Sequence, residues 1–294
     1  MIELKTEDAV NHYFKNILSS RTPMIGLDIE GEYNLHCYGE HLCLIQIYDN
    51  NECAIIDPYN FKEKDTLIRI VKIVFENNKI LKIMYDSSSD SRLINNLYKV
   101  KINSILDLRP AVQLLNYEKQ SLSSLLEVEL GIDLPPKKKF QMHNWLRRPI
   151  SSEALNYAAN DVIHLFKLKN ILMKKLMECD LLDAYTLENL NIQTKIFNNT
   201  EDKYRFTKEY IKLLSVEKIA YNEIYALREK AAESINKPVY MILKNHDLLQ
   251  IIKKRESEYN TLDSKIGNIK NWNKSSFVST ISNIIEKIAS SKAY

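Results

Sequence analysis

The segment Met24-Ile-Gly-Leu-Asp-Ile-Glu30 decides the fold of this chain. Apart from its two carboxylates it is apolar, and two further apolar runs follow at residues 42–48 and 53–56, with polar turns between them. Short runs rich in Ile and Leu and bounded by polar turns predict strands. Three strands in direct succession favour an antiparallel meander.

Helical and strand patterns alternate after the third strand. The sequence predicts a helix near 62–76, a strand at 80–85, a helix at 89–98 and a short strand near 104–107. This alternation is typical of crossover connections. The expected fold class is therefore α/β, with a mixed sheet that carries helices on its faces.

The chain beyond residue 121 is predicted to be mostly helical, with interruptions at Pro135-Pro136 and near Pro149. Ser151 or Ser152 is a candidate N-cap for a long helix that runs to about residue 178.

A polar stretch at residues 198–203 predicts a linker. Beyond it, apolar residues at helical spacing are Ile219, Ile224, Leu227 and Ala231. We therefore expect a large domain over residues 1–195, a linker over 196–210 and a small all-helical domain over 211–294.

Composition sets broad limits on function. The 294 residues are 45% hydrophobic and 27% charged, which is typical of a globular protein. A net charge of +3 permits nucleic-acid binding without requiring it. None of the four cysteines forms a C-x-x-C pair, so neither a zinc site nor a thioredoxin-like motif is indicated. The charged N-terminus and the lack of a long apolar run predict a cytoplasmic protein that does not enter a membrane.

Two carboxylates in the first strand indicate a cation site. Asp28 and Glu30 are two residues apart, so their side chains emerge on the same face of a strand. Neighbouring carboxylates repel one another unless a positive charge lies between them, and hard divalent cations prefer carboxylate oxygens. The alternative is an acidic strand end that faces water.

Two more acidic positions carry weaker signals of the same kind. Tyr157 and Asp161 are four residues apart in a predicted helix, so the phenol and the carboxylate share a face. Asp90 follows the strand at 80–85. The alternatives are an exposed Asp161 beside a core Tyr157, and an Asp90 that complements a helix dipole.

The order Asp28-x-Glu30, Asp90 and Tyr157-x-x-x-Asp161 resembles the DEDD exonucleases of the tyrosine-containing branch, and specifically the ribonuclease D family. The resemblance covers about residues 1–190. The further motifs that carry it are Leu44-Ile-Gln46, Ile56-Asp57-Pro58, Ser88-Ser89-Asp90, Leu106-Asp107, Ser121-Leu-Ser-Ser-Leu and Asn144-Trp-Leu-Arg-Arg-Pro149.

Three positions depart from the family pattern. Gly31 follows Glu30 where the family often has an aromatic residue, and Asn144 stands where an acidic residue usually precedes the Trp. Tyr85-Asp86 replaces a commoner pair of His and a small residue. These departures affect the expected contacts with the end of the substrate more than the expected chemistry, because all four acids and the Tyr are retained.

The resemblance implies a ribonuclease H-like exonuclease fold and a 3′→5′ exoribonuclease that uses two divalent cations, Mg²⁺ or Mn²⁺. Asp28 would bridge the two ions, Glu30 and Asp161 would complete the ion that activates water, and Asp90 would serve the second ion. Tyr157 would orient the attacking water and help to remove its proton. The implied product is a nucleoside 5′-monophosphate, released from the single-stranded 3′ end of a transfer-RNA precursor or another structured RNA.

The C-terminal helical region resembles an HRDC module, an accessory domain that usually helps to bind nucleic acid. Glu223-Ile-Tyr-Ala-Leu227 and Lys237-Pro238-Val-Tyr-Met-Ile242 carry this likeness. Basic residues such as Lys237 and the run 253–255 are candidate phosphate contacts, with solvated helix faces as the alternative.

Substrate contacts in the large domain are predicted at four positions: Lys137, Lys138, Lys139 and Trp145. The three lysines precede the helix that bears Tyr157 and would attract a phosphate backbone. The alternatives are a solvated loop for the lysines and a core position for Trp145.

Two other functions are compatible with the sequence. The first is a DNA 3′→5′ exonuclease, since such enzymes share the carboxylate motifs. The second is a catalytically inactive nucleic-acid-binding module. Retention of a repulsive acidic cluster argues against the second, because a binding module has no use for it.

Overall fold

The computed structural model describes residues 1–134, 140, 142–197 and 207–290, and the chain divides into two compact units. We call them the sheet unit (Met1–Glu32 and Glu40–Asn198) and the helical unit (Tyr33–Gly39 and Asn199–Tyr294). The predicted linker at 196–210 includes residues 198–206, which lie outside the described residues.

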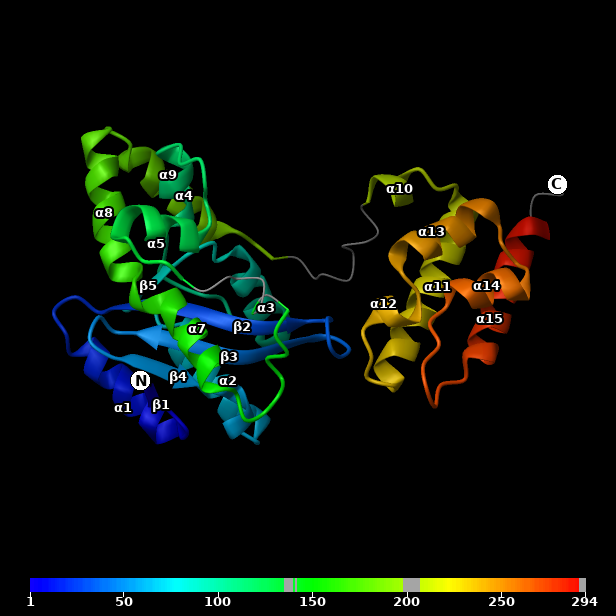
Figure 1. Ribbon diagram of the computed structural model, residues 1–294, viewed down its shortest axis with the longest axis horizontal. Coiled ribbons are helices and arrows are strands. Elements are labelled where there is room, and N and C mark those ends of the chain that lie inside the picture. Colours follow the sequence, from blue (N-terminus) through cyan, green and yellow to red (C-terminus); the bar gives the residue numbers. More distant parts are fainter. Residues whose placement is uncertain (135–139, 141, 198–206, 291–294) are drawn as a thin grey trace. The chain divides into compact units, whose positions relative to one another are not determined.

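The sheet unit is built on one mixed six-stranded sheet (Figure 1). Its strands lie in the order β1-β4-β3-β2-β5-β6. β5 is parallel to β2 and β6, whereas β3 and β4 are antiparallel. The predicted mixed α/β fold is therefore confirmed. The strands are β1 (Ile2–Glu3), β2 (Met24–Tyr33), β3 (Glu40–Tyr48), β4 (Cys53–Ile56), β5 (Leu81–Met84) and β6 (Ile105–Asp107).

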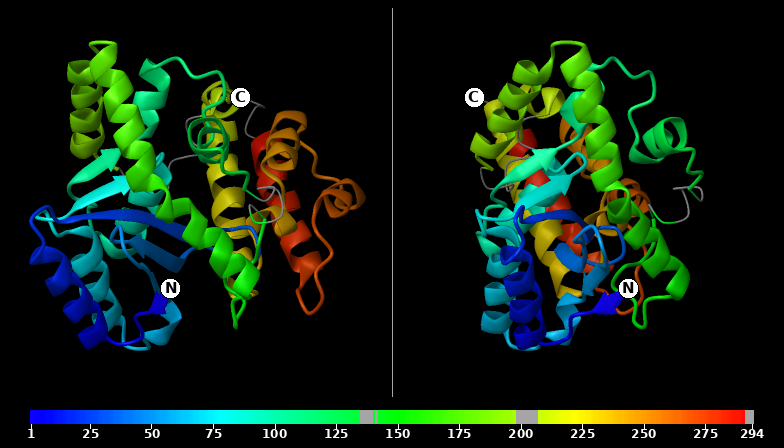
Figure 2. Two further views of the ribbon diagram at one scale, coloured as in Figure 1. Left: turned by 60° about the vertical axis from the view of Figure 1, so that its left-hand side comes forward. Right: turned by 90° about the vertical axis from the view of Figure 1, so that its left-hand side faces the viewer.

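Helices cover both faces of this sheet (Figure 2). One face packs against α1 (Glu7–Leu18), α2 (Lys64–Phe75) and α3 (Ser88–Tyr98) through a single apolar cluster. The other face packs against α7 (Ser152–Ile163) and α8 (Leu165–Glu178). Among the described residues, this unit also contains η1 (Pro58–Asn60), α4 (Arg109–Leu114), α5 (Leu122–Leu130) and α9 (Leu182–Thr194).

The helix predicted to run from Ser152 to about residue 178 is two helices. Its start is as expected, because the Ser151 hydroxyl accepts a hydrogen bond from the backbone N–H of Ala154 at 3.2 Å. The prediction of one continuous helix is wrong, since α7 ends at Ile163 and α8 starts at Leu165. The N–H of His164 donates to the carbonyl of Val162 instead of continuing the helical ladder. This break lets α7 pack on β3 and β4 while α8 packs on β5 and α5.

The helical unit has its own apolar core. Within residues 207–290, the helices of this unit are α10 (Lys208–Ile211), α11 (Ser215–Ser234), α12 (Val239–Ile242), α13 (Asn245–Lys254), α14 (Tyr259–Lys265) and α15 (Lys274–Ser290). Lys253 and Lys254 lie in the last turn of α13, where positive charge also complements the helix dipole.

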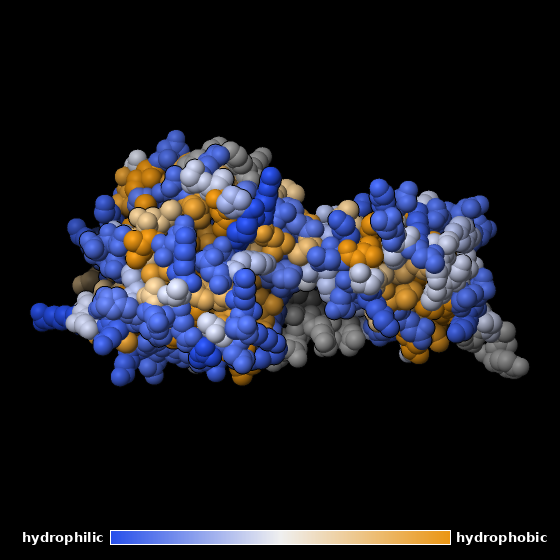
Figure 3. Space-filling view, turned by 90° about the horizontal axis from the view of Figure 1, so that it is seen from below, coloured by the Kyte–Doolittle hydropathy of each residue, from blue (hydrophilic) through white to orange (hydrophobic). Residues whose placement is uncertain are grey.

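The face drawn in Figure 3 is mostly hydrophilic, with hydrophobic residues in separate patches, as expected of an ordinary protein surface. Of the helices that the structure describes, none combines the length and the apolar composition needed to cross a membrane.

Candidate active site

Strand β2 presents two carboxylates on one face and an apolar surface on the other. Asp28 and Glu30 are half-buried, whereas Ile25, Leu27 and Ile29 between and before them are buried in the core beneath the sheet. This is the alternation that a strand with one functional face requires. The carboxylates are therefore held on a rigid element rather than on a loop.

Helix α7 brings a third carboxylate to this face. One carboxylate oxygen from each of Asp28, Glu30 and Asp161 lies within 4.8 Å of the other two. Asp28 and Glu30 were predicted from one motif and Asp161 from another, and the structure brings the three together. Tyr157 lies one helical turn before Asp161 on the same face of α7.

Gly26 allows α7 to approach the strand this closely. A Cβ atom at this position would lie 2.9 Å from the carbonyl oxygen of Val162, the residue that follows Asp161. Gly26 is two residues before Asp28, so it belongs to the face that carries the carboxylates. No motif in the sequence predicts this role. Its only signal is a glycine within an otherwise branched apolar strand.

The cluster is electrostatically strained. Burial raises the pKa of Asp28 well above its usual range, and the negative charges of Asp90, Asp161 and Glu30 raise it further. The backbone hydrogen bond of Ile29 acts in the opposite direction. The site therefore holds more negative charge than the surrounding protein compensates.

The fourth predicted carboxylate, Asp90, lies beside this group of three and not within it. It belongs to the first turn of α3 and is 8% exposed. Burial raises the pKa of Asp90 to about 7, a hydrogen bond from the Ser89 hydroxyl lowers it, and the charges of Asp107 and Asp86 raise it. Asp90 is close enough to Asp28 for its charge to raise the pKa of that carboxyl.

Asp107 fixes the turn that leads into α3. Its carboxylate accepts hydrogen bonds from the backbone N–H groups of Asp86 and Ser87 at 2.9 and 2.7 Å, and from the Ser87 hydroxyl at 2.8 Å. Asp86 has a positive φ of 60°, a conformation that non-glycine residues adopt only with support from their surroundings. Asp107, at the end of β6, thereby holds the start of the helix that carries Asp90.

Tyr157 is packed among aromatic side chains. Its ring stacks on Phe140 with centroids 4.4 Å apart and lies 6.4 Å from the ring of Trp145. Burial raises the pKa of the Tyr157 phenol, and the charges of Asp161, Glu30 and Asp28 raise it further. In this environment the phenol keeps its proton at neutral pH and can donate a hydrogen bond.

The predicted substrate contacts have different positions. Lys137, Lys138 and Lys139 lie outside the described residues. Trp145 is 4% exposed and belongs to an apolar cluster with Ala154 and Ala158 of α7. Trp145 therefore occupies the core position that was the alternative to a substrate contact. A direct contact between Trp145 and the substrate stays a prediction.

The donor set of the site fits a divalent cation. Three half-buried carboxylates converge within 4.8 Å, and burial together with the charges of the neighbouring carboxylates raises the pKa of Asp28. Hard divalent cations such as Mg²⁺ and Mn²⁺ prefer such oxygen ligands and would compensate the charge.

Residues 1–177 match the family model described as 3′-5′ exonuclease. Among curated proteins, ribonuclease D of Desulfotalea psychrophila is 29% identical over 233 residues, which are 77% of this chain and 60% of that protein. The exosome complex component 10 homolog of Caenorhabditis elegans is 26% identical over 236 residues, which are 76% of this chain and 26% of that protein. The chain thus spans between about a quarter and three fifths of the length of these relatives.

Two solved structures share the fold. The catalytic core of RRP6 from Trypanosoma brucei aligns with a TM-score of 0.76 at 20% identity, covering 99% of this chain and 80% of that one. Escherichia coli RNase D, described as an exoribonuclease involved in structured RNA processing, aligns with a TM-score of 0.72 at 21% identity, covering 98% and 74%. With three carboxylates gathered beside Tyr157 inside the segment that the family model matches, this chain belongs to the 3′-5′ exonuclease family.

Proposed function

We propose that this protein is a 3′→5′ exoribonuclease of the ribonuclease D type. The observation that carries the proposal is the convergence of Asp28, Glu30 and Asp161 within 4.8 Å, beside Tyr157, in a 3′-5′ exonuclease domain. Relatives named ribonuclease D favour RNA as the substrate.

Asp28, Glu30 and Asp161 would hold one divalent cation, and Asp28 and Asp90 a second. The bound cations would activate a water molecule and stabilise the leaving 3′ oxygen. Mg²⁺ and Mn²⁺ both fit this set of oxygen ligands.

The protein's own groups would position the reactants. The Tyr157 phenol, kept protonated by its surroundings, would donate a hydrogen bond that orients the attacking water. Half-burial of the carboxylates limits bulk water around the reacting phosphate, which strengthens each electrostatic contact. Because phosphoryl transfer needs little covalent help, positioning and charge compensation supply most of the rate enhancement. The product would be a nucleoside 5′-monophosphate.

The 3′ ends of transfer-RNA precursors or other structured RNAs are the proposed physiological substrates. The helical unit would act as an HRDC-like module that binds nucleic acid, with Lys237 and the run 253–255 as phosphate contacts. Neither role alters the chemistry at the carboxylates.

The test is degradation of a 5′-labelled single-stranded RNA with Mg²⁺, with Mn²⁺ and with EDTA. We expect a ladder that shortens from the 3′ end, and we expect EDTA to abolish it. A single-stranded DNA of the same sequence, run in parallel, separates an exoribonuclease from a DNA exonuclease. Folded protein that binds RNA but cleaves neither polymer would overturn the proposal in favour of an inactive binding module.

A further inference from the structure

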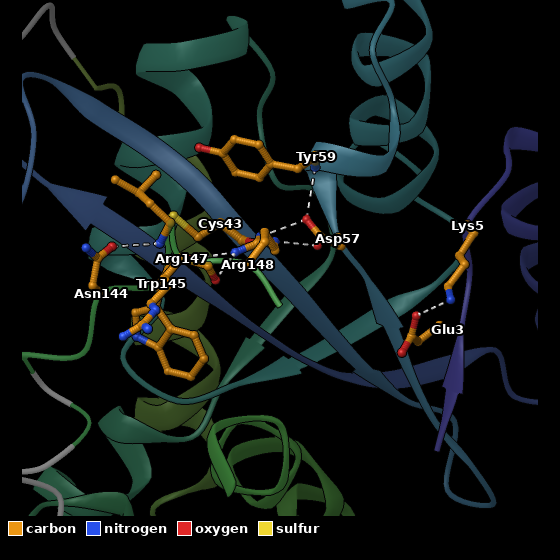
Figure 4. Close-up of polar contacts among 10 residues, drawn as sticks. Glu3, Lys5, Cys43, Asp57, Tyr59, Asn144, Trp145, Arg147 and Arg148 are labelled. Carbon is orange, nitrogen blue, oxygen red and sulfur yellow. Dashed lines mark hydrogen bonds and ion pairs between the residues drawn. The ribbon is translucent and has the colours of Figure 1, made fainter. Parts of the chain in front are cut away.

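The Arg148 side chain attaches the segment before α7 to the sheet (Figure 4). Its Nε and Nη2 donate to the two carboxylate oxygens of Asp57 at 2.6 and 2.8 Å. Nη2 also donates to the carbonyl oxygen of Cys43 in β3 at 2.8 Å. Arg148 therefore contacts β3 and the residue that follows β4 with one planar group.

The same guanidinium group fixes the backbone at Trp145. Nη1 donates to the carbonyl oxygens of Trp145 and Arg147 at 2.6 and 3.1 Å. The guanidinium carbon lies 4.7 Å from the centroid of the Tyr59 ring. A lysine has no planar fork of donors and could not make these contacts together.

Trp145 connects this anchor to the candidate active site. Its ring is buried and lies 6.4 Å from the ring of Tyr157, at an interplanar angle of 34°. Both residues belong to an apolar cluster with Cys43 of β3 and Ala154 of α7. Three residues after Arg148, the Ser151 hydroxyl caps the helix that carries Tyr157. Arg148 thus fixes the backbone of Trp145, whose ring lies beside Tyr157, and it does so three residues before the cap of the helix that carries Tyr157.

We propose that Arg148, paired with Asp57, is a positioning residue that sets the orientation of Tyr157 through Trp145 and the start of α7. This inference rests on the proposed function, because it assigns Tyr157 a role in the reaction. Arg148 contacts the backbone of Trp145, and the Trp145 ring in turn lies beside Tyr157, so Arg148 acts on the phenol indirectly. Misplacing a reacting group by about 1 Å is enough to slow an enzyme by about 100-fold.

The experiment is a double-mutant cycle between Arg148→Lys and Tyr157→Phe, measured by steady-state hydrolysis of RNA by the 294-residue chain. We expect Arg148→Lys to lower kcat by about 10- to 100-fold and to change KM by less than about 3-fold. In the Tyr157→Phe background the same substitution should cost less than about 2-fold, since the group that it positions is gone.

Two further variants keep the test decisive. Arg147→Lys is the matched control, because the neighbouring Arg147 is exposed and its expected rate equals that of the wild type. Asp57→Asn removes the partner charge with little change of shape, and should reproduce the kcat loss if Arg148→Lys does not fold. Thermal melting identifies a variant that has lost structure.

Either of two results would overturn the inference. One is a wild-type rate in Arg148→Lys. The other is an equal loss from Arg148→Lys in the wild-type and Tyr157→Phe backgrounds, which would mean that Arg148 acts independently of the phenol. Failure of the proposed function is a separate result, since wild-type protein would then leave the RNA intact before any variant is made.

Discussion

In the helical unit, the Arg228 side chain is fully buried. Its Nη1 and Nη2 groups donate hydrogen bonds within the same unit, whereas its Nε has no partner among the residues that the structure describes. These hydrogen bonds reach the Leu243 carbonyl at 3.2 Å, the Asn245 side-chain oxygen at 2.5 Å and the Glu229 carboxylate at 2.9 Å. In the sheet unit, Asp28 faces other carboxylates, and burial together with their charges raises its pKa. The first arrangement compensates a buried charge with the protein's own groups, and the second leaves charge for something else to compensate.

We infer that the Arg228 charge stabilises the fold, whereas the Asp28 charge serves the candidate active site. Arg228 links α11 to Leu243, which follows α12, and to Asn245, the first residue of α13, so its removal should loosen the helical unit. Removal of Asp28 relieves repulsion, so it should cost function and not stability. Four measurements test this contrast, from the largest expected effect to the smallest.

The largest effect is expected for Asp28→Asn. Turnover of RNA should fall by about 1000-fold or more, because the charge that holds the cations is lost. RNA binding should persist, and the melting temperature measured in EDTA should rise as repulsion is relieved. The exposed Asp183→Asn is the matched control and should keep wild-type turnover. Wild-type turnover in Asp28→Asn would remove the site assignment.

The converse is expected for Arg228→Ala. The substitution leaves buried acceptors without a donor and should lower the free energy of unfolding of the helical unit by about 4 kcal/mol. Urea denaturation followed by circular dichroism measures it, with exposed Lys230→Ala as the control, at about 0.5 kcal/mol or less. Equal stability of the two variants would contradict a structural role for the buried charge.

Lys82 of β5 is buried like Arg228, but its charge is compensated less completely. The Asn77 carbonyl accepts a hydrogen bond from its ammonium group, and burial lowers its pKa to about 8. Between pH 8 and the ordinary lysine pKa of about 10.5, Lys82 binds more protons in the unfolded chain than in the folded one, so its contribution to stability rises with pH by about 3 kcal/mol. Burial raises the pKa of Cys53 to about 11 and that of Tyr98 to about 12, so ionisation of these two groups in the unfolded chain acts in the opposite direction.

The measurement is urea denaturation of the wild type, Lys82→Met and the exposed-residue control Lys79→Met between pH 7.5 and 10.5. The difference in the free energy of unfolding between the wild type and Lys82→Met should change by about 3 kcal/mol across this range in favour of the wild type, whereas the difference between the wild type and Lys79→Met should stay constant. A constant difference between the wild type and Lys82→Met would show that Lys82 makes no such contribution.

The smallest effect is thermal stabilisation by the cation itself. At about 100 times the dissociation constant, Mg²⁺ or Mn²⁺ should stabilise the sheet unit by about 2.7 kcal/mol. For a unit of this size that corresponds to a rise in melting temperature of about 5–10 °C. Differential scanning fluorimetry should show the rise in the wild type and a smaller one in Asp28→Asn. Equal shifts in the two proteins would place the cation elsewhere.

The sequence predicted the features that depend on local pattern. The strand that carries Asp28 and Glu30, the cap at Ser151 and the mixed α/β sheet all follow from residues close together in the chain. The convergence of Asp161 on that strand was inferred through the family resemblance, because periodicity alone leaves the contact between helix and strand undetermined.

The features that the sequence did not predict depend on tertiary contacts. Gly26 matters because Val162 approaches it, and Phe140 because its ring stacks on Tyr157. Strand β1 and helix α1 were not predicted either. Strand β1 has only two residues and is defined by its pairing with β4, which no local pattern specifies.

The Asp107 carboxylate has a consequence for the entropy of cation binding. By holding the backbone of Asp86 and Ser87, it orders the turn before Asp90 when the protein folds. The conformational entropy of that segment is therefore lost before any ligand arrives. Binding at the carboxylates need not order the turn again, so affinity is gained through preorganisation, with no additional contact to the ion.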